Sequence, residues 1–251
     1  MLIDVHTHVS NGDWPTAENL VKSMDSLSID KAIVLPIESQ EAAITSTDYV
    51  LSACSRFQER LIPFCCVDPR DTPDFPTKIR RYVDLGCKGF GEYKLKLYVD
   101  DPRSKKIYEL CGKLDIPVLI HMDGTLNLDI DRYERLLRDF ASTMFIAHGP
   151  SWWRKISRKV EPTESYPKGK VEPGGKVERI LQEYPNAYAD LSAGSGYNAL
   201  NRDIEFAKRF VAKNYKKLLF GTDYDAQFLS NLSFFQLHPH LILLKKLDLN
   251  E

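Results

Sequence analysis

Eight short apolar runs recur along the chain, and longer amphipathic segments separate most of them. They occupy residues 2–6, 31–36, 61–67, 87–92, 116–121, 143–148, 187–191 and 217–221. Parallel strands need long crossover connections, so this alternation is typical of strands joined by helices. Because eight such units fit within 251 residues, the sequence predicts an α/β fold, a single (β/α)8 TIM barrel over residues 1–251.

Helix signals occupy most of the segments between the runs. Asp101 is a capping residue followed by Pro102 in the first turn, and Gly86 follows a predicted helix end. An open doubly wound sheet is the alternative fold, but its first strand usually leads into a glycine-rich phosphate loop. Here that strand ends in His6-Thr7-His8, which favours the barrel. The predicted helices cover residues 16–27, 46–57, 75–85, 102–114, 129–140, 175–184, 201–213 and 239–249.

Composition narrows the class of protein. The chain has 34 basic and 35 acidic residues, a balance that gives no sign of a nucleic-acid partner. Its five cysteines, an odd number without a Cys-x-x-Cys motif, indicate a reducing compartment rather than a disulfide framework. No apolar run approaches the ~18 residues of a membrane helix, and the first residues do not resemble a signal peptide. We therefore expect a cytoplasmic protein without a membrane partner.

Metal-binding side chains stand at the predicted strand ends. All strand carboxyl ends of such a barrel open onto one face, where active sites are built. Side chains two apart on a strand point the same way, so the first two histidines can bind one ion. The sequence therefore predicts a divalent metal site. The candidates are His6, His8, Glu92, His121, His148 and Asp223.

This mixture of imidazole and carboxylate ligands suits zinc first, with manganese, iron or nickel as alternatives. A divalent ion lowers the pKa of a coordinated water, which can then attack a carbonyl or phosphoryl centre. Asp223 is the expected catalytic acid–base, since it can accept the proton of that water and pass it to the leaving group. His238 and His240 flank Pro239, match no strand end and are not expected to be ligands.

The connection at about residues 150–175 is too long for an ordinary barrel loop and is predicted to be a lid insertion. Trp152, Trp153 and Arg154 come directly after the predicted mouth, so we expect them to give aromatic walls and a cation for an anionic substrate. The alternative is a solvated surface loop in which the tryptophans pack for structural reasons.

Further candidates follow two of the strands. Asp190 is expected either to orient a metal-binding histidine or to cap a helix. Ser192 and Tyr197 are expected to contact the substrate. Lys94 shares parity with Glu92, so it also faces the predicted mouth and is a candidate substrate-binding residue.

Taken in order, four segments resemble the amidohydrolase superfamily of metal-dependent hydrolases. They are Ile3-Asp4-Val5-His6-Thr7-His8, Pro117-Val118-Leu119-Ile120-His121, Phe145-Ile146-Ala147-His148-Gly149 and Phe220-Gly221-Thr222-Asp223. The chain is most similar to the branch that includes aminocarboxymuconate-semialdehyde decarboxylase and the dicarboxylate lactonases. The resemblance implies a distorted eight-stranded barrel, with the histidines and the last aspartate of these segments around one or two ions.

The fourth strand departs from the pattern of many superfamily members, which carry a carbamylated lysine there. The segment Gly89-Phe90-Gly91-Glu92-Tyr93-Lys94 is similar to the glutamate type found in TatD-type deoxyribonucleases. Members of the decarboxylase branch often have neither group and hold one ion. We expect Glu92 to be a ligand, with a modified Lys94 as the alternative, and the number of ions stays open.

The expected activity is metal-dependent hydrolysis of a C–O or C–N bond in a small, carboxylate-bearing lactone, ester or amide. A non-oxidative decarboxylase is the alternative. A TatD-type phosphodiesterase or nuclease is less favoured because the overall charge is balanced. A non-enzymatic barrel does not explain a full ligand set. Soluble enzymes are commonly homo-oligomers, and the sequence leaves that state open.

Overall fold

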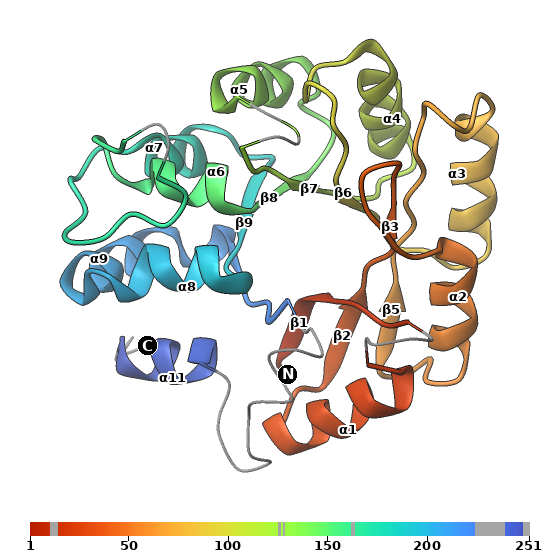
Figure 1. Cartoon of the computed structure of the whole chain (residues 1–251), viewed down its shortest axis with the longest axis horizontal. Coiled ribbons are helices and arrows are strands. Elements are labelled where there is room, and N and C mark those ends of the chain that lie inside the picture. The colour runs from red at the N-terminus through yellow and green to blue at the C-terminus, as the bar shows by residue number, and fades with distance from the viewer. Residues whose placement is uncertain (11–14, 125–126, 128, 162–163, 224–238, 248–251) are drawn as a thin grey trace.

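The computed structural model describes residues 1–10, 15–124, 127, 129–161, 164–223 and 239–247. In this part of the chain, parallel strands form a ring and the helices lie outside it (Figure 1). Each of the eight predicted runs overlaps one strand of the ring, so the predicted barrel is confirmed. The strands are β1 (Ile3–Thr7), β2 (Lys31–Val34), β5 (Leu61–Pro63), β6 (Phe90–Tyr93), β7 (Val118–His121), β8 (Phe145–His148), β9 (Ala187–Asp190) and β10 (Leu218–Leu219).

The ring is built from two sheets, which gives the barrel its distortion. One sheet has the order β1-β2-β5 and the other β10-β9-β8-β7-β6. At one junction, Cys65 forms an isolated parallel bridge with Phe90. At the other, the Val5 amide donates to the Phe220 carbonyl at 2.9 Å, and the Asp223 amide donates to the His6 carbonyl at 2.9 Å. The second junction therefore joins the first strand to the segment that carries a candidate ligand.

The helices between the strands agree with the predicted segments, and local capping explains several of their ends. The Asp101 side chain accepts from the Arg103 amide at the start of α4, and Gly86, at φ 114°, follows the end of α3. Residues 248 and 249 of the last predicted helix lie outside the described residues. The matching helices are α1 (Ala17–Leu27), α2 (Thr47–Ser55), α3 (Phe75–Asp84), α4 (Pro102–Lys113), α5 (Ile130–Asp139), α7 (Lys176–Glu183), α9 (Ile204–Asn214) and α11 (Pro239–Lys246).

Several elements are absent from the sequence prediction because they are short or rich in glycine. These are the hairpin of β3 (Ile37–Glu38) and β4 (Ala43–Thr45), the helices α6 (Pro150–Trp153) and α8 (Ala193–Asn201), and the 3-10 helices Arg154–Ile156 and Tyr215–Lys217. In α8, a Cβ at Gly196 would lie 2.0 Å from the Leu191 carbonyl oxygen. The glycine thus lets the helix pack directly on the end of β9.

No helix in the described ranges combines the length and the apolar character that crossing a bilayer requires.

Candidate metal centre

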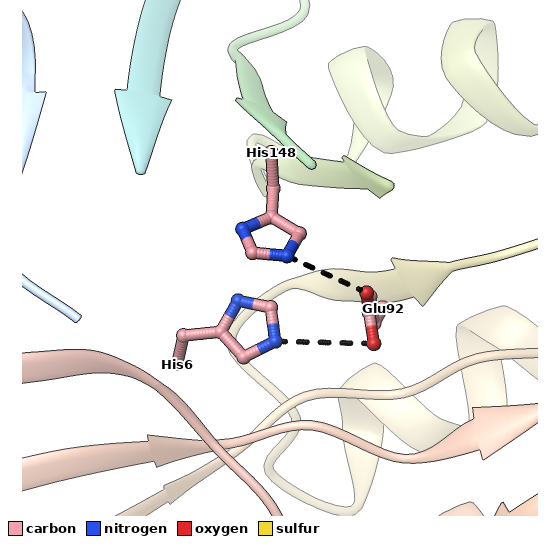
Figure 2. A group of neighbouring side chains, drawn as sticks. All are labelled: His6, Glu92 and His148. Atoms are coloured by element: carbon pink, nitrogen blue, oxygen red, sulfur yellow. Dashed lines mark ion pairs between the residues drawn. The ribbon is translucent and has the colours of Figure 1, made fainter. Parts of the chain in front are cut away.

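Side chains from four strands meet at one end of the barrel. β1 contributes His6, and His8 follows directly after the strand. β6 contributes Glu92, β7 contributes His121, and β8 contributes His148. Figure 2 shows the side chains of His6, Glu92 and His148 pointing toward one another from three separate strands. All five side chains are buried. The structure therefore brings the ligand candidates of these strands into one enclosed centre.

Asp223 completes one side of the centre. The Nε2 atoms of His6 and His8 lie 3.1 Å apart. Asp223 Oδ1 lies 3.5 Å from each of these two nitrogens. The Asp223 side chain is 28% exposed, whereas the imidazoles of His6 and His8 are 0% and 1% exposed. Among these three groups, Asp223 is therefore the one that solvent or a substrate can reach.

Glu92 lies between two pairs of histidines. Its Oε2 atom is 3.8 Å from His6 Nε2 and 3.6 Å from His8 Nε2. Its Oε1 atom is 2.7 Å from His121 Nδ1 and 4.0 Å from His148 Nε2. The two oxygens of one carboxylate thus face different histidine pairs.

Three of the four imidazoles are oriented by acceptors on the outer side of their rings. Asp190 Oδ2 lies 2.6 Å from His6 Nδ1 and 3.0 Å from His148 Nδ1. His8 Nδ1 donates to the Leu35 carbonyl at 2.8 Å. A proton held on Nδ1 leaves the Nε2 lone pair directed inward, as metal-binding histidines require. Asp190 therefore lies where the sequence analysis expects an orienting acid, and one carboxylate serves two rings.

The Ser192 side chain lies between Asp190 and His148. Its hydroxyl donates to Asp190 Oδ2 at 2.7 Å, and lies 3.0 Å from His148 Nδ1, from which it accepts. The residue is completely buried. The hydroxyl is therefore used between two residues of the centre, and its expected contact with substrate stays a prediction. The signal for this role is the Asp-x-Ser spacing at a strand end, which directs both side chains the same way.

The donor set fits a divalent cation. Two groups of ligand atoms, those of His6, Glu92 and His148 and those of His6, His8 and Asp223, each lie within 4.8 Å of one another. Two imidazole nitrogens on one tetrahedral zinc ion, at ~2.1 Å each, are about 3.4 Å apart. The 3.1 Å separation of His6 Nε2 and His8 Nε2 is close to that spacing. Neutral nitrogen and carboxylate donors of this kind are the ligands that zinc and manganese use.

The charges of the centre are strongly coupled. Burial alone would raise the pKa of Glu92, but His121, His6 and Lys94 hold it well below its usual range. Burial likewise opposes ionisation of Asp223, while His6 and His8 lower its pKa. Burial opposes a charge on His6, yet the neighbouring carboxylates raise its pKa well above the ordinary value. Without a cation, the carboxylates of Glu92 and Asp223 are therefore ionised, and they stabilise the protonated form of His6.

Lys94 lies at the edge of the centre and is half-buried. Its ammonium group is among the charges that lower the pKa of both Glu92 and His121. No ion pair joins it to another side chain in the described ranges of the protein. Its role in binding substrate stays a prediction.

The two tryptophans that follow β8 are buried. Trp152 and Trp153 are 0% and 1% exposed and belong to the hydrophobic core. Trp152 packs edge-on against Tyr133 with ring centroids 5.6 Å apart. Trp153 Nε1 donates to the Asp190 carbonyl at 2.9 Å. Both side chains thus pack in the core, as the alternative of the sequence analysis expects, because burying large aromatic surfaces is favourable. Their contact with substrate stays a prediction.

The remaining candidates have mixed positions. Arg154 begins a 3-10 helix and is half-buried, and its proposed contact with substrate stays a prediction. Tyr197 lies in α8, where its ring packs edge-on against His240 at 5.7 Å between centroids. This contact uses one edge of the ring for packing between helices.

Sequence reasoning missed Asn127. This buried side chain donates to the Tyr93 carbonyl at 2.7 Å and to the His121 carbonyl at 3.1 Å. It thereby ties together the ends of β6 and β7, which carry Glu92 and His121. The only local signal is its residue type, since asparagine tolerates the left-handed backbone found there, at φ 50°.

Comparison with protein families gives one match. The amidohydrolase family model matches residues 3–225, nearly the whole chain. A search among curated proteins finds no match.

Several solved structures share the fold. A probable 2-pyrone-4,6-dicarboxylic acid hydrolase from Acinetobacter baumannii, with citric acid bound, is 15% identical with a TM-score of 0.65; the match covers 99% of this chain and 92% of that one. A 5-carboxyvanillate decarboxylase from Novosphingobium aromaticivorans, complexed with manganese and 4-hydroxy-3-methoxy-5-nitrobenzoic acid, is 15% identical with a TM-score of 0.57 over 96% of each chain. An uncharacterised TIM-barrel protein from Bordetella bronchiseptica is 16% identical with a TM-score of 0.63, covering 98% of this chain and 99% of that one. At these identities the likeness shows the barrel fold.

Proposed function

Since the chain belongs to the amidohydrolase family, whose members are metal-dependent enzymes, we propose that it hydrolyses a C–O or C–N bond in a small, carboxylate-bearing lactone, ester or amide. One observation carries this proposal: the two oxygens of Glu92 face separate histidine pairs. A carboxylate between two ligand sets favours two ions, and paired ions suit hydrolysis because each can stabilise one of the reacting oxygens.

The residues of the centre have different proposed roles. His6, His8 and Asp223 would hold one cation. Glu92 and His148, which form a second ligand group with His6, would hold the other, and His121 lies 2.7 Å from Glu92 beside this group. A divalent cation here, with zinc favoured and manganese as the alternative, supplies Lewis-acid activation of water and of the carbonyl group. Asp190 and Ser192 keep the histidine rings oriented.

Asp223 is the proposed acid–base. Its carboxylate is ionised, because nearby histidines outweigh the effect of burial and lower its pKa. It is also the partly exposed member of its cluster, at 28%. An ionised, accessible carboxylate can accept a proton from water and then donate it to the leaving oxygen or nitrogen. Lys94 and Arg154 are the cations proposed to bind the substrate carboxylate.

The first test is metal content, measured by elemental mass spectrometry on protein purified without added metal or chelator. We expect about two ions per chain, as in two-metal hydrolases. The number of ions per chain should fall to about one in Glu92→Ala, and it should fall further in His6→Ala. Glu109→Ala is the matched control, because Glu109 is exposed and pairs with Lys113 far from any ligand in sequence. Lactones, esters and amides that carry a carboxylate then form the substrate screen.

A decarboxylase is the second candidate, supported by the structural similarity to a 5-carboxyvanillate decarboxylase. One ion per chain that is unaffected by Glu92→Ala would favour it over the hydrolase. Carboxylated aromatics and dienes would then enter the screen, with released carbon dioxide as the signal. A nitrophenyl phosphodiester in the same screen tests the less favoured TatD-type reaction.

A further inference from the structure

The C-terminal helix α11 lies beside α8 (Figure 1). Its second residue, His240, is buried between the two helices. The ring packs edge-on against Tyr197, and its Nε2 donates to the Ala193 carbonyl at 3.0 Å. Burial lowers the pKa of His240, so the ring is neutral at physiological pH and acts as a hydrogen-bond donor. This contact falls on the first residue of α8, immediately after Ser192.

Ala193 has a backbone conformation that needs support. Its φ of 58° lies in the left-handed region, which residues with a Cβ disfavour. Such a conformation persists only where surrounding contacts hold it in place. The hydrogen bond from His240 is one such contact, and its donor lies 47 residues later in the sequence.

The turn that this conformation creates determines where Ser192 points. The Ser192 amide donates to Asp190 Oδ1 at 2.8 Å, and its hydroxyl donates to Asp190 Oδ2 at 2.7 Å. The same hydroxyl lies 3.0 Å from His148 Nδ1. A change in the backbone at Ala193 would move the Ser192 hydroxyl away from this nitrogen. Asp190 Oδ2, 3.0 Å away, would then be the remaining acceptor of the Nδ1 proton, and the preference of the imidazole for this tautomer would weaken.

We propose that His240 is a positioning residue of the metal centre: it holds the Ala193 carbonyl, and the turn so fixed keeps the Ser192 hydroxyl on His148 and Asp190. The inference rests on the proposed metal site. It couples the docking of α11 to the direction in which the His148 lone pair points.

The test compares variants that separate this hydrogen bond from simple packing. His240→Phe keeps an aromatic ring against Tyr197 but has no donor, and His240→Gln restores an N–H donor. Leu243→Ala is the control, because Leu243 is buried in the same helix and its apolar side chain has no hydrogen-bond donor. If His240→Phe does not fold, His240→Leu takes its place.

Two readouts are used. The first is zinc affinity, from competition with a chromogenic chelator. The second is the tautomer of His148 in the metal-free protein, from nitrogen-15 NMR of histidine-labelled samples. We expect His240→Phe to lower zinc affinity about tenfold, as is usual when an outer partner of a metal ligand is lost. His240→Gln should recover most of that loss. Leu243→Ala should lower the melting temperature without changing zinc affinity or the tautomer.

Two double variants make the assignment specific. If His240 acts through Ser192, adding His240→Phe to Ser192→Ala should not lower zinc affinity further. Adding Ala193→Gly to His240→Phe should restore affinity, because glycine adopts the left-handed conformation without a penalty.

The proposal is overturned if His240→Phe retains wild-type affinity and tautomer, or if its effect multiplies with that of Ser192→Ala. Failure of the metal site is a separate outcome. If wild-type protein binds no zinc, the proposed function fails, and the His148 tautomer in the metal-free variants still decides the role of His240.

Discussion

Gly221 shows how little spare volume the metal centre has. A Cβ at this position would lie 2.6 Å from Asp190 Oδ1, 2.9 Å from the Ser192 Cβ and 3.1 Å from the His6 Cβ. Contacts this short require the neighbours to move. The neighbours are the acid that orients two histidines, the serine beside it, and a ligand candidate.

We therefore expect Gly221→Ala to lower zinc affinity at least about tenfold, since displaced partners of metal ligands usually cost that much. The measurement is the same chelator competition. Gly124→Ala is the control, because a Cβ there meets nothing within 4 Å. Wild-type affinity in Gly221→Ala would contradict the crowded geometry.

Lys94 gives a second prediction for a single residue. Lys94→Met keeps the length of the side chain and removes its charge. If the ammonium binds the substrate carboxylate, KM for an acidic substrate should rise about tenfold or more, as expected for the loss of a charge-assisted contact. Zinc content should stay unchanged. An unchanged KM, or an equal rise for the neutral amide of the same substrate, would count against this role.

At this scale the sequence predicts that the candidate ligands converge, but it does not predict the side chains that support them. His6, His8, Glu92, His121 and His148 can be found because strand parity and strand ends determine where they point. The roles of Ser192 and the two tryptophans depend on how α6 and α8 pack, which no short-range pattern records. A serine near a mouth and a tryptophan after a ligand have the same local sequence whether they face substrate or core.

Among the elements, the connections at the mouth are held by one arginine. Arg70 donates to Glu41 Oε2 at 2.7 Å and to both oxygens of Asp68. Glu41 also accepts from the Lys96 amide at 3.2 Å. The Arg70 side chain is 14% exposed, and hydrogen bonds from it lower the pKa of Glu41 to about 2. Arg70 thus ties the β3–β4 hairpin to the segments that follow β5 and β6.

Arg70→Ala should lower the free energy of unfolding, because it leaves the carboxylates of Glu41 and Asp68 facing each other without a cation. We expect a loss of about 2 kcal/mol, which lies between the values for exposed and for buried ion pairs. For a chain of this size that corresponds to a fall of roughly 4–8 °C in the melting temperature. Arg103→Ala is the control, since its ion pair with Asp101 is local and 44% exposed on the arginine side. Equal melting temperatures for the two variants would refute the role of Arg70.

The elements themselves were largely predictable. The β-branched runs and the capped amphipathic segments set the eight strands and the main helices, because both patterns are local. The β3–β4 hairpin was missed because strands of two and three residues carry no periodicity. The α8 helix was missed because Gly194 and Gly196 lower helix propensity, and the need for Gly196 comes from its close approach to Leu191, directly after β9.

For the whole molecule, the coupled charges make metal binding depend on pH. Without a cation, the carboxylates raise the pKa of His6 well above its usual value, so this ring carries a proton near neutral pH. Ligation requires the neutral ring, so binding must release that proton. The raised pKa stabilises the metal-free fold at low pH, and that contribution is lost as pH rises through the folded-state pKa.

We therefore expect zinc affinity to rise with pH, by about tenfold per pH unit for each proton displaced. Zinc should also raise the melting temperature more at about pH 8 than at about pH 6. Calorimetric titration in buffers of different ionisation enthalpy measures the protons released. Zinc affinity that does not vary with pH would contradict a protonated His6.

The two-sheet construction of the barrel bears on how the protein is made in the cell. His6 belongs to one sheet and His8 follows its first strand, whereas Glu92, His121 and His148 belong to the other sheet. The proposed ligands extend from residue 6 to residue 223, so the first of them leaves the ribosome long before the last. Ions held by these residues and by Asp223 would join the first strand of the barrel to the segment after the last. Metal binding would then follow closure of the barrel, rather than assist the first strands to fold.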